Sequence, residues 1–359
     1  MNRRWICSDV WMDILPSFHR PQLGFKMALL SYRFDLLVDT HFDGKTELTL
    51  MKLIIINKDC GTKPKLSVHI DGKFVDFPLP DRPLPNNVRF KNLQIEYIDH
   101  SVIAFLRANK HIWDSKGTTL EMPMSETKID DKQPKWDVLA REIWPIFGTS
   151  TRCLSLNDGD HLDPLCRRIS PTILTDLDQL IAIDFEYMFF HGRIADDDEP
   201  NATCSASQVL FKWLHTPSKD GQLKNLLWRD TELDEEGSLD WINSFKETFM
   251  RATASVSYQI VFGIGIEPLP TPIEPFELVN EGTKEKLTLK EGGYIYWLLK
   301  RCPIVGETTD PWEEDENWDS KLNTVKFSLC DGGTGNCIGP LSPPAEEEEK
   351  EEADESNED

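Results

Sequence analysis

The fold is decided by the stretch Leu93-Gln94-Ile95-Glu96-Tyr97-Ile98-Asp99-His100-Ser101-Val102-Ile103-Ala104-Phe105-Leu106, which encodes a short strand and then a helix. Residues 93–97 predict the strand. From Val102 onwards, apolar residues recur at helical spacing as far as Ile112, which predicts an amphipathic helix. A strand that leads directly into a helix is the unit from which α/β proteins are built.

The same alternation of strands and helices extends from about residue 88 to residue 263. Further strands are predicted over 119–122, 153–156, 180–184, 223–228 and 258–262. Helices are predicted between them, within 136–147, 170–177, 209–214 and 242–252. We therefore predict an α/β fold, α+β for the chain as a whole. Its strand–helix units stack on a parallel sheet as a degenerate, leucine-rich-repeat-like solenoid.

Segments rich in β structure are predicted on both sides of this array. Residues 48–56 alternate with a period of two, and Asp71-Gly72 joins the predicted strands 65–70 and 73–77 as a tight hairpin. Four more strands are predicted over 276–280, 285–289, 294–302 and 325–329. From residue 339 the chain is Pro-rich and then Glu-rich, which predicts a disordered acidic tail.

The first 43 residues predict three short helices. Ser8 or Asp9 can cap the first, Pro21 opens the second, and Ser31 can cap the third. Apolar side chains are crowded here at Trp11, Ile14, Leu15, Phe18, Leu23, Phe25, Leu29, Phe34, Leu37 and Val38. Three short helices need fewer for a core, so we expect the surplus to form an interface. The alternative is packing against the β segment that follows.

This N-terminal segment resembles an F-box. The resemblance lies in Asp9-Val10-Trp11-Met12-Asp13-Ile14-Leu15-Pro16-Ser17-Phe18-His19-Arg20-Pro21-Gln22-Leu23-Gly24, in Ala28-Leu29-Leu30-Ser31-Tyr32-Arg33-Phe34 and in Leu37-Val38. Ile6-Cys7-Ser8 stands where an F-box usually begins with Leu-Pro. The remainder is similar to the F-box-associated region of a nematode F-box protein family, in the stretches 97–106, 212–217, 274–278 and 297–304.

The resemblance implies a substrate-recognition subunit of a Skp–cullin–F-box ubiquitin ligase. Residues 5–45 would be the F-box, 46–87 a hairpin and Pro-rich connector, 88–338 the associated region, and 339–359 the acidic tail. The Skp-type adaptor, and through it a cullin, would be held by Val10, Trp11, Ile14, Leu15, Phe18, Pro21, Leu23, Leu29, Phe34 and Leu37. The alternative is a stand-alone interaction scaffold with a degenerate F-box.

The net charge of −23 indicates which classes of partner the chain can bind. An acidic chain repels phosphate, so we expect binding neither to nucleic acid nor to an anionic membrane surface. We expect a protein substrate with a basic face. Its candidate aromatic anchors are Trp228, Trp297, Trp312 and Trp318, for which the alternative is ordinary core packing.

The sequence lacks motifs for catalysis or for metal binding, and we expect a chain without catalytic activity, cofactor or metal. The sequence contains no G-x-S-x-G, H-E-x-x-H or Walker-type motif. Cys153, His161 and Cys166 match no zinc spacing, and the acidic run 196–199 lacks the pattern of a calcium loop. The eight cysteines form no C-x-x-C pair and no signal peptide is predicted. We therefore expect the reducing cytoplasm or nucleus.

Overall fold

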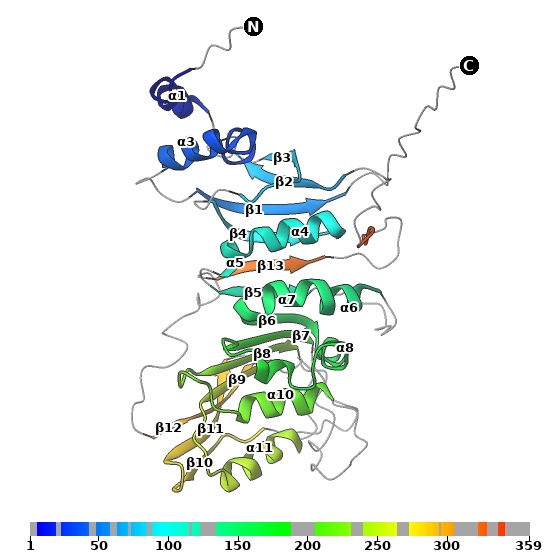
Figure 1. The fold of residues 1–359 in the computed structure, drawn as a ribbon. Helices are drawn as coiled ribbons and strands as arrows, with labels where there is room; N and C mark the ends of the chain where they lie inside the picture. Colours follow the sequence, from blue (N-terminus) through cyan, green and yellow to red (C-terminus); the bar gives the residue numbers. More distant parts are fainter. Residues whose placement is uncertain are drawn as a thin grey trace, which may run out of the picture.

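The structure, a computed structural model, describes residues 6–18, 23–42, 48–57, 63–70, 73–84, 88–114, 117–122, 134–187, 205–230, 240–263, 273–293, 296–304, 322–328 and 337–341. These residues fold around one sheet of thirteen strands (Figure 1). In spatial order the strands are β10 (Phe276–Asn280), β11 (Glu285–Gly293), β12 (Tyr296–Pro303), β9 (Tyr258–Gly263), β8 (Lys224–Asp230), β7 (Ala182–Tyr187), β6 (Thr151–Asp158), β5 (Thr118–Met122), β13 (Asn323–Phe327), β4 (Val88–Ile95), β1 (Leu48–Ile56), β2 (Lys65–Ile70) and β3 (Lys73–Pro78).

The sheet is mostly parallel. All neighbouring strands from β9 to β1 in the spatial order run parallel. Antiparallel strands extend the sheet at both ends, with β2 and β3 beside β1, and β12, β11 and β10 beside β9. The predicted α/β class is thereby confirmed. One sheet contains both β1 to β3, which precede residue 87, and the strands that follow it. The sequence had predicted a boundary between two segments of the chain at that residue.

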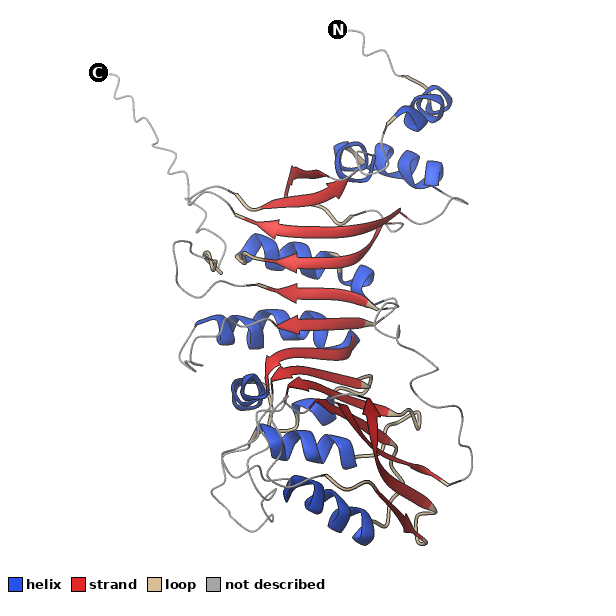
Figure 2. Ribbon diagram, turned by 180° about the vertical axis from the view of Figure 1, so that it is seen from behind, coloured by secondary structure: helices blue, strands red, loops and turns tan. Residues whose placement is uncertain are grey.

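Helices cover one face of the sheet, and the view from behind shows the strands of the opposite face uncovered by helices (Figures 1 and 2). The helices of the array are α4 (His100–Ala108), α5 (Lys110–Asp114), α6 (Pro134–Val138), α7 (Trp144–Phe147), α8 (Leu162–Arg168), α9 (Ile173–Asp176), α10 (Ala206–His215) and α11 (Asp240–Arg251). Helix α8 was not predicted, because its apolar residues span only two turns. The helix predicted over 170–177 is the short α9.

Local capping chemistry sets where two of the longer helices begin. The Asp99 carboxylate accepts hydrogen bonds of 2.9 Å from the backbone N–H groups of Ser101 and Val102, and this starts α4. Ser205 and Gln208 exchange side-chain and backbone hydrogen bonds as a capping box at the start of α10. These side chains supply partners for N–H groups that the helix itself cannot satisfy.

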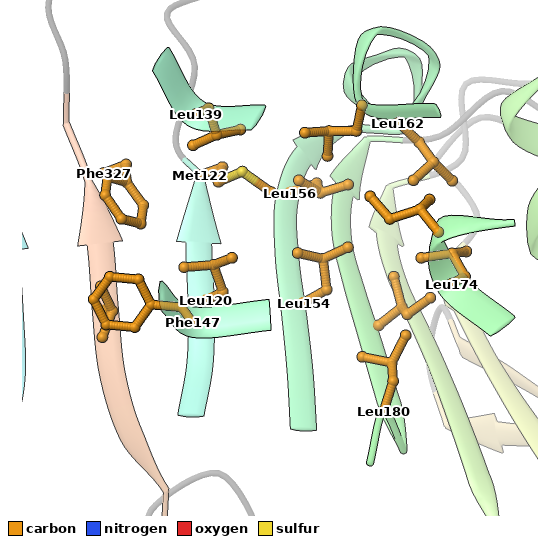
Figure 3. Close-up of a cluster of buried hydrophobic side chains, with 14 of the residues drawn as sticks. Leu120, Met122, Leu139, Phe147, Leu154, Leu156, Leu162, Leu174, Leu180 and Phe327 are labelled. Atoms are coloured by element: carbon orange, nitrogen blue, oxygen red, sulfur yellow. The ribbon is translucent and has the colours of Figure 1, made fainter. Parts of the chain in front are cut away.

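The core lies between the helices and the sheet, and its side chains form rows across the strands. One row, built from residues paired in register, is Leu53, Leu93, Val325, Leu120, Leu154, Ile183, Leu226 and Ile260. All eight are buried, and Figure 3 shows Leu120 and Leu154 among them. Residues between the rows point to the opposite face, because side chains of a strand alternate. That face, here called the open face, carries a largely polar row of Lys326, Glu121, Ser155 and Asp184.

The position of β13 is the main departure from a simple array. The sequence predicts this strand, but the structure places it between β4 and β5, which precede it by about two hundred residues. It runs parallel to both neighbours. The last segment of the described chain therefore completes the middle of the sheet.

The N-terminal helices form a small module of their own. It comprises α1 (Ser8–Ile14), a 3-10 turn (Leu15–Ser17), a π turn (Leu23–Met27), a 3-10 turn (Ala28–Leu30) and α3 (Tyr32–Phe42). Its buried residues Leu15, Leu23, Ala28, Leu37 and Val38 make a cluster separate from the core of the sheet. Among the described residues, the module therefore builds its own core instead of packing its buried apolar residues into the β region.

The sequence predicted where these helices lie, but it predicted their capping residues less well. The residue before α1 is Cys7, which makes no side-chain capping bond, so the predicted cap at Ser8 or Asp9 is wrong. The Ser31 hydroxyl accepts a hydrogen bond from the Phe34 N–H at 3.4 Å, as predicted for the third helix. The predicted second helix consists of one π turn and one 3-10 turn, and its predicted start at Pro21 lies outside the described residues.

Candidate partner-binding surfaces

The N-terminal module exposes an unusual share of large apolar side chains. Eleven such side chains are exposed in the described chain. Five of them lie between residues 6 and 36, namely Ile6, Val10, Leu30, Tyr32 and Leu36. We call these five the N-terminal apolar patch. Tyr32 is 79% exposed and Leu36 is 56% exposed, so both side chains offer most of their surface to solvent.

Two contacts hold the parts of the patch together. The Arg33 Nη2 donates a hydrogen bond of 2.7 Å to the carbonyl oxygen of Ile6, which ties the start of α1 to the start of α3. The rings of Trp11 and Phe34 meet edge to face, with centroids 4.8 Å apart. Tyr32 and Leu36 lie one turn apart on α3, and so share one face of that helix.

The residues predicted to bind the adaptor differ in how far their side chains are buried. Val10 is exposed, and Trp11, Ile14, Phe18 and Phe34 are half-buried. Leu15, Leu23 and Leu37 are instead internal to the module, so in this structure they support its fold and offer no surface. Pro21 lies outside the described residues, and nothing is described of the Leu29 side chain.

Sequence reasoning missed four members of the patch, at Ile6, Leu30, Tyr32 and Leu36. The sequence carried a signal for two of them. Tyr32 and Leu36 are four residues apart, and Phe34, Leu37 and Val38 recur at helical spacing in the same segment. An α3 with apolar residues on both faces needs cover on both. The module supplies that cover on one face only.

The open face of the sheet is the second candidate surface. It carries a short aliphatic strip of Leu227 and Val261, which are half-buried and paired in register on β8 and β9. Leu298 continues the row on β12 but is buried. Asp184 continues the same row on β7. Further along, Lys326 and Glu121 form an ion pair of 3.5 Å across β13 and β5. The face therefore offers a short apolar strip with a carboxylate at one end.

The tryptophans proposed as anchors do not belong to this surface. Trp228 is fully buried, with its ring centroid 5.2 Å from that of Trp241. Trp297 is half-buried and packs against the main core. Core packing, the alternative considered for both, is what the structure shows. Trp312 and Trp318 lie outside the described residues.

Several buried polar side chains cap the carboxyl ends of helices. The Lys224 ammonium on β8 donates to the carbonyl oxygens of Trp213 and Thr216 at the end of α10. The Asn280 Nδ2 on β10 donates to Phe249 and Ala252 at the end of α11, at 2.7 and 3.1 Å. Each donor satisfies carbonyl groups that a helix leaves without partners. Burial lowers the pKa of Lys224 to about 8.

A buried ion pair joins the antiparallel strands beyond β9. Arg301 on β12 donates from Nε and Nη2 to Glu285 Oε2, at 3.0 and 2.6 Å. The other carboxylate oxygen accepts from Ser255 Oγ and the Val256 N–H. Ionisable groups buried together are candidates for an active site. Here both side chains are engaged in holding β11 and β12 to the segment that follows α11.

An aromatic cluster lies beside this pair. His215 stacks against Phe211, with ring centroids 4.1 Å apart, and meets Tyr258 at 5.3 Å. The imidazole is half-buried as a whole, but its Nε2 reaches no solvent. This burial lowers the pKa of His215 to about 4, and the nearby charges of Arg301 and Lys224 act in the same direction. Burial raises the pKa of Tyr258 far above its ordinary value.

The thiols and acids form no metal centre in the described residues. No group of three or more His, Cys, Asp or Glu side chains there is placed to hold a metal ion. Cys153 packs with Ala182 and Leu322, whereas Cys166 lies in the main core, so the two thiols belong to different clusters. Cys7, Cys153, Cys166 and Cys302 form no disulfide, but Cys337 is disulfide-bonded. Cysteine usage is therefore weaker evidence for a reducing compartment than the sequence suggested.

Comparison with protein-family models, with curated proteins and with solved structures returns no match for this chain. Within the described residues, no helix combines the length and the apolar character needed to cross a membrane.

Proposed function

We propose that this chain is a non-catalytic adaptor that links a target protein to a Skp–cullin ubiquitin ligase. The observation that carries the proposal is the N-terminal apolar patch. Five large apolar side chains are exposed on one small helical module, which already has a complete core of its own. Large apolar side chains exposed close together, as Tyr32 and Leu36 are on one face of α3, mark sites of protein association. The resemblance of this segment to an F-box supplies the identity of the partner.

The docking half of the function is assigned to α1 and α3. Tyr32 and Leu36 are the proposed anchors, because both are large, exposed and on one face of α3, and such side chains contribute most when a partner covers them. Val10 and Ile6 extend the contact from α1, held in place by the Arg33 hydrogen bond. Leu15, Leu23 and Leu37 support this surface from within.

The recognition half is assigned to the open face of the sheet. The strip of Leu227 and Val261 provides apolar contact, and Asp184 adds a carboxylate in the same row. A target segment with an aliphatic residue next to a lysine or arginine fits this arrangement. The chain then acts through proximity, because holding the target beside a charged conjugating enzyme raises its effective concentration.

The docking half is tested by co-purification of the tagged chain with the Skp-type adaptor. Leu36→Glu places a charge in the patch without touching the core of the module, and we expect it to lose about 2 kcal/mol or more of binding free energy. Met250→Glu is the matched control, since Met250 is also on a helix, α11, and is 55% exposed. Equal recovery of the adaptor with both variants would contradict the proposed docking surface.

A stand-alone interaction scaffold is the second candidate function. The observation that favours it is the start of the F-box segment, where Ile6-Cys7-Ser8 replaces the usual Leu-Pro pair. In this case the open face would bind its target, but the module would not bind the adaptor. The same co-purification separates the two functions, because a scaffold recovers no adaptor even as the unaltered chain.

A further inference from the structure

The open face of the sheet carries one continuous row of side chains from β7 to β11. In spatial order, the residues paired in register are Asp184, Leu227, Val261, Leu298 and Lys290. Figure 2 shows this side of the sheet uncovered by helices. Each strand contributes one residue, so a ligand that lies across the strands meets the five residues in turn. We call these five residues the open-face row.

The end of the row at β11 is basic. Lys290 is exposed, and the half-buried Lys300 on β12 lies diagonally opposite, because Lys290 pairs with Leu298 and Lys300 with Thr288. Such diagonal neighbours are about 7 to 8 Å apart, and like charges at this distance repel each other. Glu277 on β10 also lies opposite Thr288, but neither lysine forms an ion pair or a hydrogen bond with any described residue. Two adjacent lysines without a carboxylate partner, in a chain of net charge −23, favour an anion between them.

The other end of the row is acidic, and the middle is apolar. Asp184 is half-buried on β7, and Glu186 is exposed two residues further along the same strand, so both point to the open face. Leu227 and Val261 lie between the two ends and keep part of their aliphatic surface accessible. The row therefore changes from acidic through apolar to basic along its length.

The length of the row defines the spacing of the groups on a matching ligand. Four strand spacings separate β7 from β11, which amounts to about 19 Å. An extended peptide rises about 3.3 Å per residue and turns alternate side chains to the same side. Its first, third, fifth and seventh side chains therefore face one surface over about 20 Å. A peptide with a cation first, aliphatic residues third and fifth, and an anion seventh matches the row in charge, polarity and length.

From these observations we infer that the open face binds an extended segment of the target with a basic residue, aliphatic residues and an acidic residue in this spacing. The inference rests on the recognition half of the proposed function, to which it adds the acidic residue and the distance between the charges. The acidic residue lies between Lys290 and Lys300, and the basic residue lies against Asp184 and Glu186. Opposite charges at the two ends also fix the direction of the segment across the sheet.

Peptide binding to the full-length chain, measured by fluorescence anisotropy, tests the inference. The first peptide has lysine, leucine, leucine and glutamate at its first, third, fifth and seventh positions, with serine between them. The second has alanine at the seventh position, and the third has lysine there. We expect the glutamate peptide to bind about fivefold more tightly than the alanine peptide, and the lysine peptide to bind most weakly. Equal affinities for the glutamate and alanine peptides, or no binding of any peptide, would overturn the inference.

Reversing the charge of the basic end provides a second test. In Lys290→Glu/Lys300→Glu the preference should invert, so that the lysine peptide binds about fivefold more tightly than the glutamate peptide. This gain of binding requires a folded chain, so unfolding cannot produce it. Lys290→Glu alone, at an exposed position, should abolish the preference for the glutamate peptide. Lys219→Glu is the matched control, because Lys219 is exposed but lies outside the row, and it should keep the original preference. An unchanged preference in both Lys290 variants would contradict the inference.

The outcomes separate this inference from the proposed function. If the unaltered chain binds the Skp-type adaptor but does not distinguish the peptides, only the inference fails. If the chain prefers the glutamate peptide but binds no adaptor, the docking half of the proposed function fails and the inference stands. The Lys290 and Lys300 variants leave the N-terminal apolar patch unaltered, so they should bind the adaptor as the unaltered chain does.

Discussion

The guanidinium of Arg301 donates two hydrogen bonds to a single carboxylate oxygen of Glu285, and neither side chain is more than 1% exposed. A third donor–acceptor contact runs from Arg301 Nη2 to the Ala254 carbonyl oxygen at 2.9 Å. Desolvation of two charges is costly, and the pair is stable only because its hydrogen bonds are satisfied. The pair joins β11 and β12 to the turn after α11, and thereby anchors the antiparallel end of the sheet.

Breaking this pair should therefore destabilise the chain more than almost any surface change. Arg301→Met leaves the Glu285 carboxylate buried without its cation, and we expect a loss of about 3 to 5 kcal/mol in the free energy of unfolding. Urea denaturation followed by fluorescence measures it. Lys219→Met is the control, because it removes an exposed ion pair with Asp178 and should cost about 1 kcal/mol or less. Equal losses for the two variants would refute the assignment.

The buried imidazole of His215 predicts a pH dependence of stability. Its pKa is about 4 in the folded chain and near 6.5 in the unfolded chain, so the unfolded state binds more protons between these values. The contribution of His215 to the free energy of unfolding is therefore fully present above pH 6.5. It is lost as the pH drops towards 4, which lowers the free energy of unfolding by at most about 3 kcal/mol. His215→Phe keeps the ring contacts and should flatten that part of the curve. If His215→Phe loses as much stability between pH 7 and pH 4.5 as the unaltered chain does, the buried imidazole is not the cause of that loss.

Residues 337–341 are hydrogen-bonded to Ile98 and His100 at the start of α4, and we call this contact the C-terminal latch. Its glycine predicts a specific steric effect. A Cβ added to Gly339 would lie 2.0 Å from the Tyr97 hydroxyl oxygen, so Gly339→Ala cannot keep the latch in place without a shift. We expect loss of amide protection at Ile98 and His100 in hydrogen exchange, with the helix α10 unaffected. Gly221→Ala is the contrasting variant: its Cβ would meet no atom within 4 Å, and its positive φ of 64° confines the backbone strain to the turn at residue 221, away from Ile98. Protection at Ile98 that survives Gly339→Ala would show that the latch does not depend on this contact.

Buried and exposed leucines of the N-terminal module should separate folding from binding. Leu15→Glu buries a charge in the core of the module, and we expect that module to unfold. Leu36→Glu leaves the core intact, so the helical content measured by circular dichroism should stay that of the unaltered chain. Adaptor binding should be lost in both. If Leu36→Glu also unfolds the module, the patch cannot be assigned as a surface by this substitution.

The sequence indicated the elements of the array because their signals are local. Each predicted strand from 93–97 to 258–262 has a counterpart in the sheet, since a short apolar run bounded by turn residues has few alternatives. The place of β13 was not predictable in this way. Five residues, Asn323–Phe327, encode a strand but carry no information about which edges it joins. Pairing between distant segments is decided by contacts that a single-sequence pattern does not record.

The same limit explains what was found and missed in the candidate site. The crowding of apolar residues before residue 43 predicted an interface, but none of the crowded residues whose burial is described is exposed, and the exposed patch consists of other residues. Residue type alone did not separate Leu37, which is buried, from Leu36 beside it, which is exposed. Lys224 is another such case, because a lysine at a strand start gives no sign that it will cap α10. These roles follow from tertiary packing, which overrides local preference.

Titration of the purified chain with the purified Skp-type adaptor shows directly whether the N-terminal apolar patch binds that adaptor. We expect a saturable one-to-one complex, weakened at least about tenfold by Leu36→Glu and unchanged by Met250→Glu. No binding by the unaltered chain, or equal affinities for all three proteins, would contradict it.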